Sequence, residues 1–130
     1  MDIVFLDASV LFSAAYRSDN KLLKLWELPE VRLVSSPYAI AEANRNLAEI
    51  EQRDRLSALL QSVIHSIAPL YPLPAGVDLP AKDKPILQAA IAAHATHLLT
   101  GGKKHFGPYF GQAIEGVTIF APAAYFKLKA

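Results

Sequence analysis

Residues Leu79–Phe106 read LPAKDKPILQAAIAAHATHLLTGGKKHF and hold a complete helix-to-strand unit. Asp83 precedes an apolar run over residues 86–91 whose spacing is that of an amphipathic or wholly buried helix. Pro85 falls in the first turn of this helix, where its missing N–H costs nothing. The run 97–100 is too short for a helix and ends at a Gly-Gly pair, so it predicts a strand. Helices that alternate with buried strands indicate a parallel α/β sheet.

The rest of the chain continues this alternation. Further strands are expected at 3–6, at 31–34, at 68–71 as an edge strand, and at 116–120. Helices are expected at 8–12, 21–28, 37–50, 54–67 and 123–128. In the third of these helices, the residues expected to face the core are Tyr38, Ile40, Ala41, Leu47 and Ile50. The order of elements predicts an α/β fold with three layers, α/β/α, around a mostly parallel sheet.

Length and composition limit the class of protein. The 130 residues are expected to form one domain, 1–130, and 52% hydrophobic with 19% charged residues indicates a packed globular chain. A net charge of +1 and a pI near 8.0 neither require nor exclude a nucleic-acid partner. The absence of cysteine excludes disulfides and cysteine-ligated zinc. No secretory signal and no long apolar run is seen, so we expect a cytoplasmic protein that does not enter the membrane.

Three acidic residues occupy related places in the predicted sheet. Asp7 follows the first strand, Glu42 lies in the helix after the second strand, and Asp83 begins the helix before the strand 97–100. In a parallel sheet these places face the same rim. Carboxylates that lie together repel one another, so the arrangement is best explained by Mg²⁺ or Mn²⁺, which prefer oxygen ligands. The structural alternative is that Asp7 is a helix cap and Glu42 a solvated glutamate.

The sequence around these acids resembles the PIN domains, a family of metal-dependent ribonucleases that includes many toxins of bacterial and archaeal toxin–antitoxin pairs. The resemblance rests on IVFLDASVLFSA with Asp7, SPYAIAEANRNL with Glu42 and LPAKDKPILQAAIAAHATHLLTGGKKHFG with Asp83, in this order. It implies that the three carboxylates coordinate Mg²⁺ or Mn²⁺ and that metal-activated water hydrolyses RNA. It also implies about five parallel strands, an antitoxin partner and a homodimer.

The sequence departs from this family at one position of the expected site. Members commonly have a fourth acid in the turn after the fourth strand, and here that turn reads TGGK with Gly102 at the acidic position. Asp2 stands five residues before Asp7 on an extended strand, roughly 16 Å away, and Glu115 precedes the last strand, so neither replaces the acid. Thr100 can contribute a hydroxyl. The alternative function is therefore a degenerate PIN domain that binds RNA or protein without cleaving RNA.

Lysines surround the same rim. Lys82 and Lys84 flank Asp83, and Lys103 and Lys104 follow position 102. These side chains are interpreted either as phosphate-binding groups or as a solvated charged loop. The residues expected to contact substrate are Ser9, Thr100, Lys82, Lys84, Lys103 and Lys104.

Several alternatives stay open at the level of sequence. His105 either packs against the neighbouring phenylalanine ring or takes part in catalysis, and Arg45 and Asn46 are candidates for contacts to the carboxylates. Haloacid-dehalogenase-like phosphatases and receiver domains also place an aspartate after the first strand. The former require a second aspartate where Ser9 stands, and the latter require an acidic pair that Asp2 lies too early to supply. Neither class accounts for the other two acids.

Overall fold

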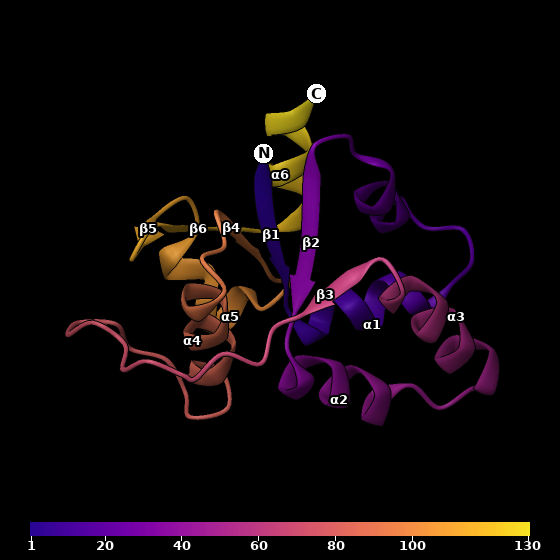
Figure 1. Cartoon of the computed structure of the whole chain (residues 1–130), viewed down its shortest axis with the longest axis horizontal. Helices are drawn as coiled ribbons and strands as arrows, with labels where there is room; N and C mark the ends of the chain where they lie inside the picture. The colour runs from indigo at the N-terminus through magenta and orange to yellow at the C-terminus, as the bar shows by residue number, and fades with distance from the viewer.

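The computed structural model describes residues 1–130, and a six-stranded sheet forms its centre (Figure 1). The strands run in the order β3-β2-β1-β4-β6-β5, and every pair of neighbours is parallel except β5 and β6. The strands are β1 (Asp2–Leu6), β2 (Val31–Ser35), β3 (Val63–His65), β4 (His97–Leu99), β5 (Ala113–Ile114) and β6 (Val117–Phe120). The expected α/β fold with a mostly parallel sheet is confirmed, and five of the six strands are parallel.

The helices pack around this sheet. They are α1 (Ala8–Tyr16), the 3₁₀ helix η1 (Lys21–Glu27), α2 (Pro37–Asn46), α3 (Ile50–Leu60), α4 (Lys84–Ala92), α5 (Lys103–Phe106), the 3₁₀ turn η2 (Gly107–Tyr109) and α6 (Pro122–Lys129). In Figure 1, α1, α2 and α3 gather beside β3, and α1 packs against the other two. Helix α4 contacts β4 and also α2.

The central strand β1 sets the position of the candidate site. Its residues Val4, Phe5 and Leu6 are fully buried, as expected of an apolar strand covered on both faces. β2 lies on one side of β1 and β4 on the other, so the chain changes direction across the sheet between β1 and β4. Ligands of open parallel sheets bind outside the carboxyl ends of the strands at such a switch point.

The single helix predicted over residues 54–67 is wrong. Helix α3 ends at Leu60, and Val63 and Ile64 belong to β3, which pairs in parallel with β2. Their spacing continues the apolar pattern of α3, but β-branched side chains fit a strand equally well, and only pairing with the distant β2 decides between the two. The edge strand predicted at 68–71 is also wrong, because β3 already occupies that edge and the segment has no regular structure.

The face that helix α2 buries agrees only in part with the one expected: Leu47 is buried and Ile40 packs partly buried against the core, but Ala41 is exposed. Ala39, Ala43 and Leu47, spaced four residues apart, are buried, whereas Tyr38 and Ile50 are exposed by 40% and 72%. Ala39 and Ala43 allow α2 to pack closely on α1, and this packing turns Tyr38 outward. The helix also ends before residue 50. As a result Tyr38 lies on the surface of α2, where it reaches the segment before α4.

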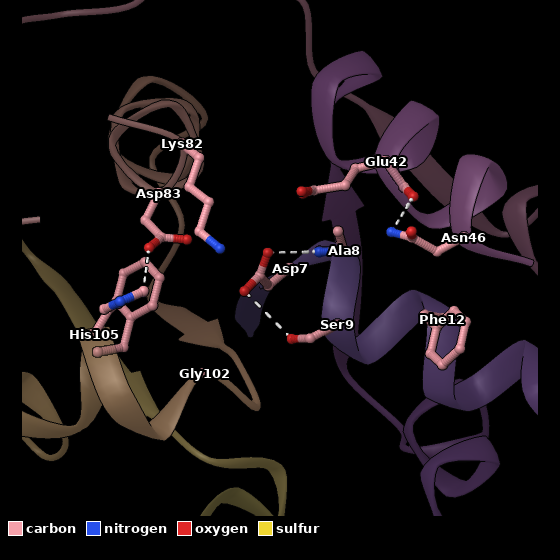
Figure 2. Close-up of a pocket in the computed structure, with 11 residues that line it drawn as sticks. Asp7, Ala8, Ser9, Phe12, Glu42, Asn46, Lys82, Asp83, Gly102 and His105 are labelled. Atoms are coloured by element: carbon pink, nitrogen blue, oxygen red, sulfur yellow. Dashed lines mark hydrogen bonds and ion pairs between the residues drawn. The ribbon is translucent and has the colours of Figure 1, made fainter. Parts of the chain in front are cut away.

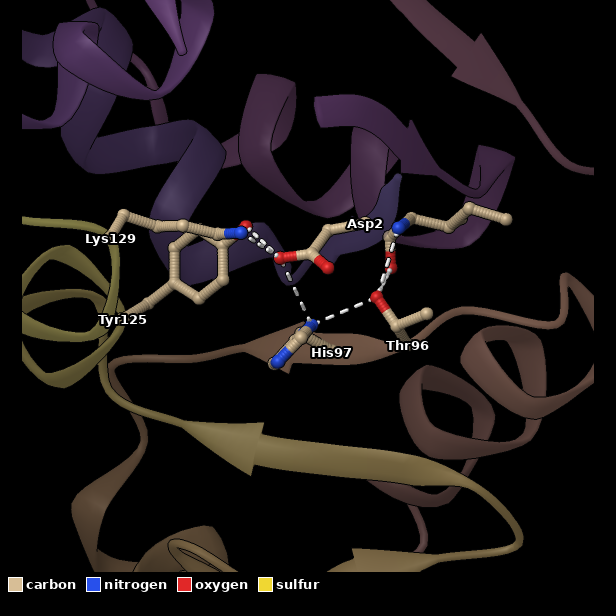
Figure 3. A network of polar contacts seen from close by, with 6 residues as sticks. Asp2, Thr96, His97, Tyr125 and Lys129 are labelled. Atoms are coloured by element: carbon tan, nitrogen blue, oxygen red, sulfur yellow. Dashed lines mark hydrogen bonds and ion pairs between the residues drawn. The ribbon is translucent and has the colours of Figure 1, made fainter. Parts of the chain in front are cut away.

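A polar network ties the last helix to the first strand at the amino end of β1, away from the carboxyl ends of the parallel strands (Figure 3). Oδ2 of Asp2 accepts a hydrogen bond from the hydroxyl of Tyr125 at 2.8 Å and lies 2.7 Å from Nζ of Lys129. Beside it, the hydroxyl of Thr96 donates to the carbonyl of Ile3 and accepts from its N–H. Asp2 therefore has a structural role, and α6 is held to the sheet by charge as well as by packing.

Replacing Asp2 with asparagine is expected to lower the free energy of unfolding by about 1 kcal/mol at pH 7. The contact with Lys129, and secondarily the hydrogen bond from Tyr125, hold the pKa of Asp2 below its ordinary value despite partial burial. Such a carboxyl stabilises the fold above its unfolded pKa of about 3.9, and the contribution is lost as pH falls through the lower folded value. Urea unfolding of both proteins from pH 2 to 7 checks this; a difference independent of pH contradicts it.

Candidate active site

A pocket of about 500 Å³ opens at the carboxyl ends of β1 and β4 (Figure 2). Its walls come from the start of α1, the middle of α2, the segment before α4, and α5 with the turn that precedes it. The lining residues are Asp7, Ala8, Ser9, Phe12, Glu42, Asn46, Lys82, Asp83, Gly102, His105 and Phe106. All three acids identified in the sequence thus line one pocket, and this pocket lies at the switch point of the sheet.

Asp7 is the buried carboxylate of the pocket, with 7% of its surface exposed. Its Oδ1 accepts the N–H of Ala8 at 2.6 Å, and its Oδ2 accepts the hydroxyls of Thr100 at 2.6 Å and Ser9 at 3.3 Å. Burial raises the pKa of Asp7 above its ordinary value, and the charge of Asp83 adds to this, although the hydrogen bonds oppose it. Asp7 is the N-cap of α1. A helix cap alone does not explain why the second carboxylate, that of Asp83, lies near enough to affect its pKa.

The two hydroxyl residues expected to contact substrate hold Asp7 in place. Thr100 is completely buried, and its oxygen accepts the N–H of Gly102 at 3.0 Å while its own proton points to Asp7. The hydroxyl of Ser9 lines the pocket and accepts the N–H of Gly101 at 3.0 Å. These bonds connect the turn after β4 to the start of α1, so they fix the position of the Asp7 carboxylate.

Glu42 reaches the pocket from α2 and is half-buried. Figure 2 shows its carboxylate turned toward Asp7. Asn46, one turn later, donates its amide N–H to the backbone carbonyl of Glu42 at 2.9 Å rather than to the carboxylate. Arg45 is exposed and does not line the pocket. The carboxylate of Glu42 therefore has no hydrogen bond that would stop it from turning.

Asp83 stands at the N-cap position of α4, yet its side chain makes no capping hydrogen bond. Its Oδ2 is buried and has no hydrogen-bond partner. Nδ1 of His105 lies 2.8 Å from this oxygen, within ion-pair distance. His105 comes from α5, and 30% of its side chain is exposed in the pocket. A buried carboxylate oxygen without a hydrogen bond is costly, and the contact with His105 offsets that cost by charge only when the imidazole is protonated.

Tyr38 is a residue of this region that sequence reasoning assigned to the core. Its hydroxyl donates to the backbone carbonyl of Lys82 at 2.8 Å and so joins α2 to the segment that carries Asp83. Burial first, and then the charges of Glu42 and Asp83, raise the pKa of Tyr38. A tyrosine directly after Pro37 in the first helical turn carries no sequence signal for such a bridge, because its partner is a backbone group 44 residues away.

The four lysines have different places relative to the pocket. Lys82 lines it and extends between the walls in Figure 2, whereas Lys84, Lys103 and Lys104 are exposed outside it. No carboxylate lies within ion-pair distance of Lys82. One lysine is therefore near the carboxylates, and the other three are on the surface around them.

The pocket contains ligands suited to a hard divalent cation. Three carboxylates line it, and one of their oxygens is buried and unpartnered. As the side chains stand, no three His, Asp or Glu residues lie close enough together to hold one ion. The composition of the site thus fits such a cation, while the carboxylates are not gathered around one point.

Comparisons with known proteins bear on the fold. No family model and no curated protein matches the sequence. Among solved structures, a chain of VapBC-1 from nontypeable Haemophilus influenzae, determined at 2.2 Å resolution, superposes with a TM-score of 0.57. The fold resembles that of this VapBC-1 chain. The match covers 93% of this chain and 98% of the VapBC-1 chain at 18% identity, so the likeness extends over the whole fold. No helix has the length and apolar character needed to cross a membrane.

Proposed function

We propose that this chain is a metal-dependent ribonuclease that hydrolyses phosphodiester bonds of RNA. The observation that carries the proposal is that Asp7, Glu42 and Asp83, from three separate parts of the fold, line one pocket at the switch point of the sheet. Carboxylates that share a pocket without a cation are costly to keep ionised. The resemblance to PIN domains and the fold likeness to VapBC-1 support this reading of the pocket.

Mg²⁺ or Mn²⁺ held by Asp7, Glu42 and Asp83 would supply an activated water and would stabilise negative charge on a phosphoryl oxygen. The protein's own contribution differs among the three ligands. Hydrogen bonds from Thr100 and Ser9 fix Asp7, which makes it the rigid member of the set. Glu42 has a carboxylate free of hydrogen bonds, so it can move closer to Asp7 and Asp83 to complete the site.

The RNA backbone is proposed to lie across the mouth of the pocket. Lys82 is placed to contact the phosphate nearest the carboxylates, and Lys84, Lys103 and Lys104 are placed to contact flanking phosphates. Tyr38 holds the segment before α4 against α2 and so keeps Lys82 and Asp83 at the rim. Phosphate contacts of this kind position RNA without reading its sequence.

We also propose that the chain is the toxin of a toxin–antitoxin pair and forms a homodimer. Both follow from the resemblance to PIN domains, and the VapBC-1 fold agrees with it. Light scattering on the purified chain measures the dimer. Co-purification with the product of an adjacent small gene tests the antitoxin.

A second candidate function is a degenerate domain that binds RNA or protein without cleavage. Two observations favour it: glycine occupies position 102, and no three acidic or histidine side chains are yet gathered around one point. This candidate keeps the pocket and the lysines but removes the chemical step.

Removal of divalent cations is expected to abolish cleavage of a mixed RNA pool by the wild-type chain, and adding Mn²⁺ is expected to restore it. Gel analysis of RNA incubated with the chain in EDTA, and after addition of excess Mn²⁺, measures the effect. The control variant is Asp54→Asn, which changes an exposed carboxylate of α3 outside the pocket and is expected to depend on Mn²⁺ in the same way as wild type. Cleavage that persists in EDTA contradicts the metal requirement, and binding without cleavage under every condition supports the degenerate domain.

A further inference from the structure

We propose that His105 is a nitrogen ligand of the metal site and takes the place of the acid that is absent at position 102. This inference rests on the proposed metal-dependent function and specifies which ion the pocket prefers. The three acids can donate electron pairs to a metal only through oxygen. His105 is the side chain of the pocket that can donate one through nitrogen.

The first observation is the contact between His105 and Asp83. Nδ1 of His105 and Oδ2 of Asp83 are 2.8 Å apart, yet the oxygen has no hydrogen-bond partner. Figure 2 marks this ion pair with a dashed line at the left wall of the pocket. A simple ion pair between a histidine and a buried aspartate is expected to orient the N–H at the oxygen.

The distance suits two ligands of one ion. Ligands about 2.1 Å from a metal in adjacent octahedral positions are about 3 Å apart. The 2.8 Å between Nδ1 of His105 and Oδ2 of Asp83 is close to that separation. A shared ion would also satisfy the buried oxygen that the protein leaves without a hydrogen bond.

The second observation is where α5 places its side chains. Gly102 is the N-cap of α5 and His105 follows three residues later, so the two positions lie on the same side of the first turn. Both line the pocket. A donor lost at residue 102 is therefore replaceable from residue 105 without moving the helix.

A nitrogen ligand changes which ion binds best. Mg²⁺ prefers an all-oxygen shell, whereas imidazole favours first-row transition ions over Mg²⁺. A site of three carboxylates and one imidazole is thus expected to bind Mn²⁺ at least about tenfold more tightly than Mg²⁺.

Calorimetric titration of the full chain with Mn²⁺ and with Mg²⁺, together with ¹⁴N coupling in pulsed electron paramagnetic resonance of bound Mn²⁺, tests the assignment. His105→Ala is expected to lose the nitrogen coupling and about 100-fold in Mn²⁺ affinity, with less than about threefold change for Mg²⁺. His105→Asp is expected to keep Mg²⁺ binding but show no coupling. His65→Ala, which changes an exposed histidine of β3 outside the pocket, is expected to match wild type. Thermal melts show whether each variant folds.

The outcomes separate the two proposals. Mn²⁺ binding by wild type without nitrogen coupling, or coupling and affinity that survive in His105→Ala, overturns the role of His105 and leaves the metal-dependent ribonuclease standing. Absence of any Mn²⁺ or Mg²⁺ binding by wild type overturns both. If His105→Ala fails to fold, His105→Asp supplies the same test, because it also lacks nitrogen.

Discussion

Asp7→Asn is expected to reduce RNA cleavage at least about 1,000-fold, equivalent to about 4 kcal/mol of transition-state stabilisation, without destabilising the fold. Asp7 is the carboxylate that the protein holds most firmly, through Ala8, Ser9 and Thr100. Asparagine keeps one oxygen acceptor, and its amide can donate to Thr100 after the hydroxyl turns. The substitution therefore removes the negative charge that a metal requires but leaves the packing around residue 7 unchanged.

The stability of the same variant distinguishes a site residue from a structural one. Burial raises the pKa of Asp7, so the ionised carboxylate destabilises the metal-free fold, and this cost grows as pH rises through the folded pKa. Asp7→Asn removes the cost. Its unfolding free energy is expected to exceed that of wild type at pH 7 and to match it below about pH 3.9, where the carboxyl is neutral in both states.

Cleavage of the mixed RNA pool in Mn²⁺ and urea unfolding at pH 3.5 and 7 check the two parts of this prediction. Asp54→Asn, at an exposed position in α3, is the matched control and is expected to behave as wild type in both. If Asp7→Asn cleaves RNA at a rate within tenfold of wild type, Asp7 is not a catalytic residue. A loss of stability at pH 7 means that Asp7 is chiefly a helix cap.

The convergence of the three acids was predictable because it depends on topology alone. Asp7 directly follows an apolar strand, and Asp83 begins the helix that leads into the next strand at the switch point. All parallel strands end at the same edge, so strand order by itself brings such residues together. Glu42 could be singled out because it interrupts a stretch of small and apolar residues in α2.

Features that depend on contacts between distant residues were not predictable. The apolar residues of α2 form two candidate faces, and packing against α1 selects the one that contains Ala39 and Ala43, which leaves Tyr38 outside. Residues 63–65 form the strand β3 because they pair with β2, since by sequence these three residues also fit a helix. The contact between His105 and Asp83 joins two side chains whose sequence separation carries no periodic signal.

Gly102→Asp is expected to raise Mg²⁺ affinity at least about tenfold and to increase cleavage in Mg²⁺, because it adds the oxygen ligand that the site lacks. The backbone accepts the change: φ at residue 102 is −78°, which any L-residue adopts. A Cβ there would lie 3.3 Å from Oγ1 of Thr100 and 3.6 Å from the ring of Phe106, so Thr100 must move slightly. Without metal the variant is expected to be less stable, since a further carboxylate joins Asp7 and Asp83.

Gly102→Asn is the matched control, because it has the same shape and crowds Thr100 equally but brings no charge. Calorimetry with Mg²⁺ and Mn²⁺ and cleavage of the RNA pool compare the two variants with wild type. If wild type is inactive and only the aspartate variant cleaves, the chain is a degenerate domain one ligand short of catalysis. If His105 already occupies the coordination position of the absent acid, Gly102→Asp is expected to raise the affinity for Mg²⁺ more than the affinity for Mn²⁺. Equal affinities in both variants mean that residue 102 does not face the ion.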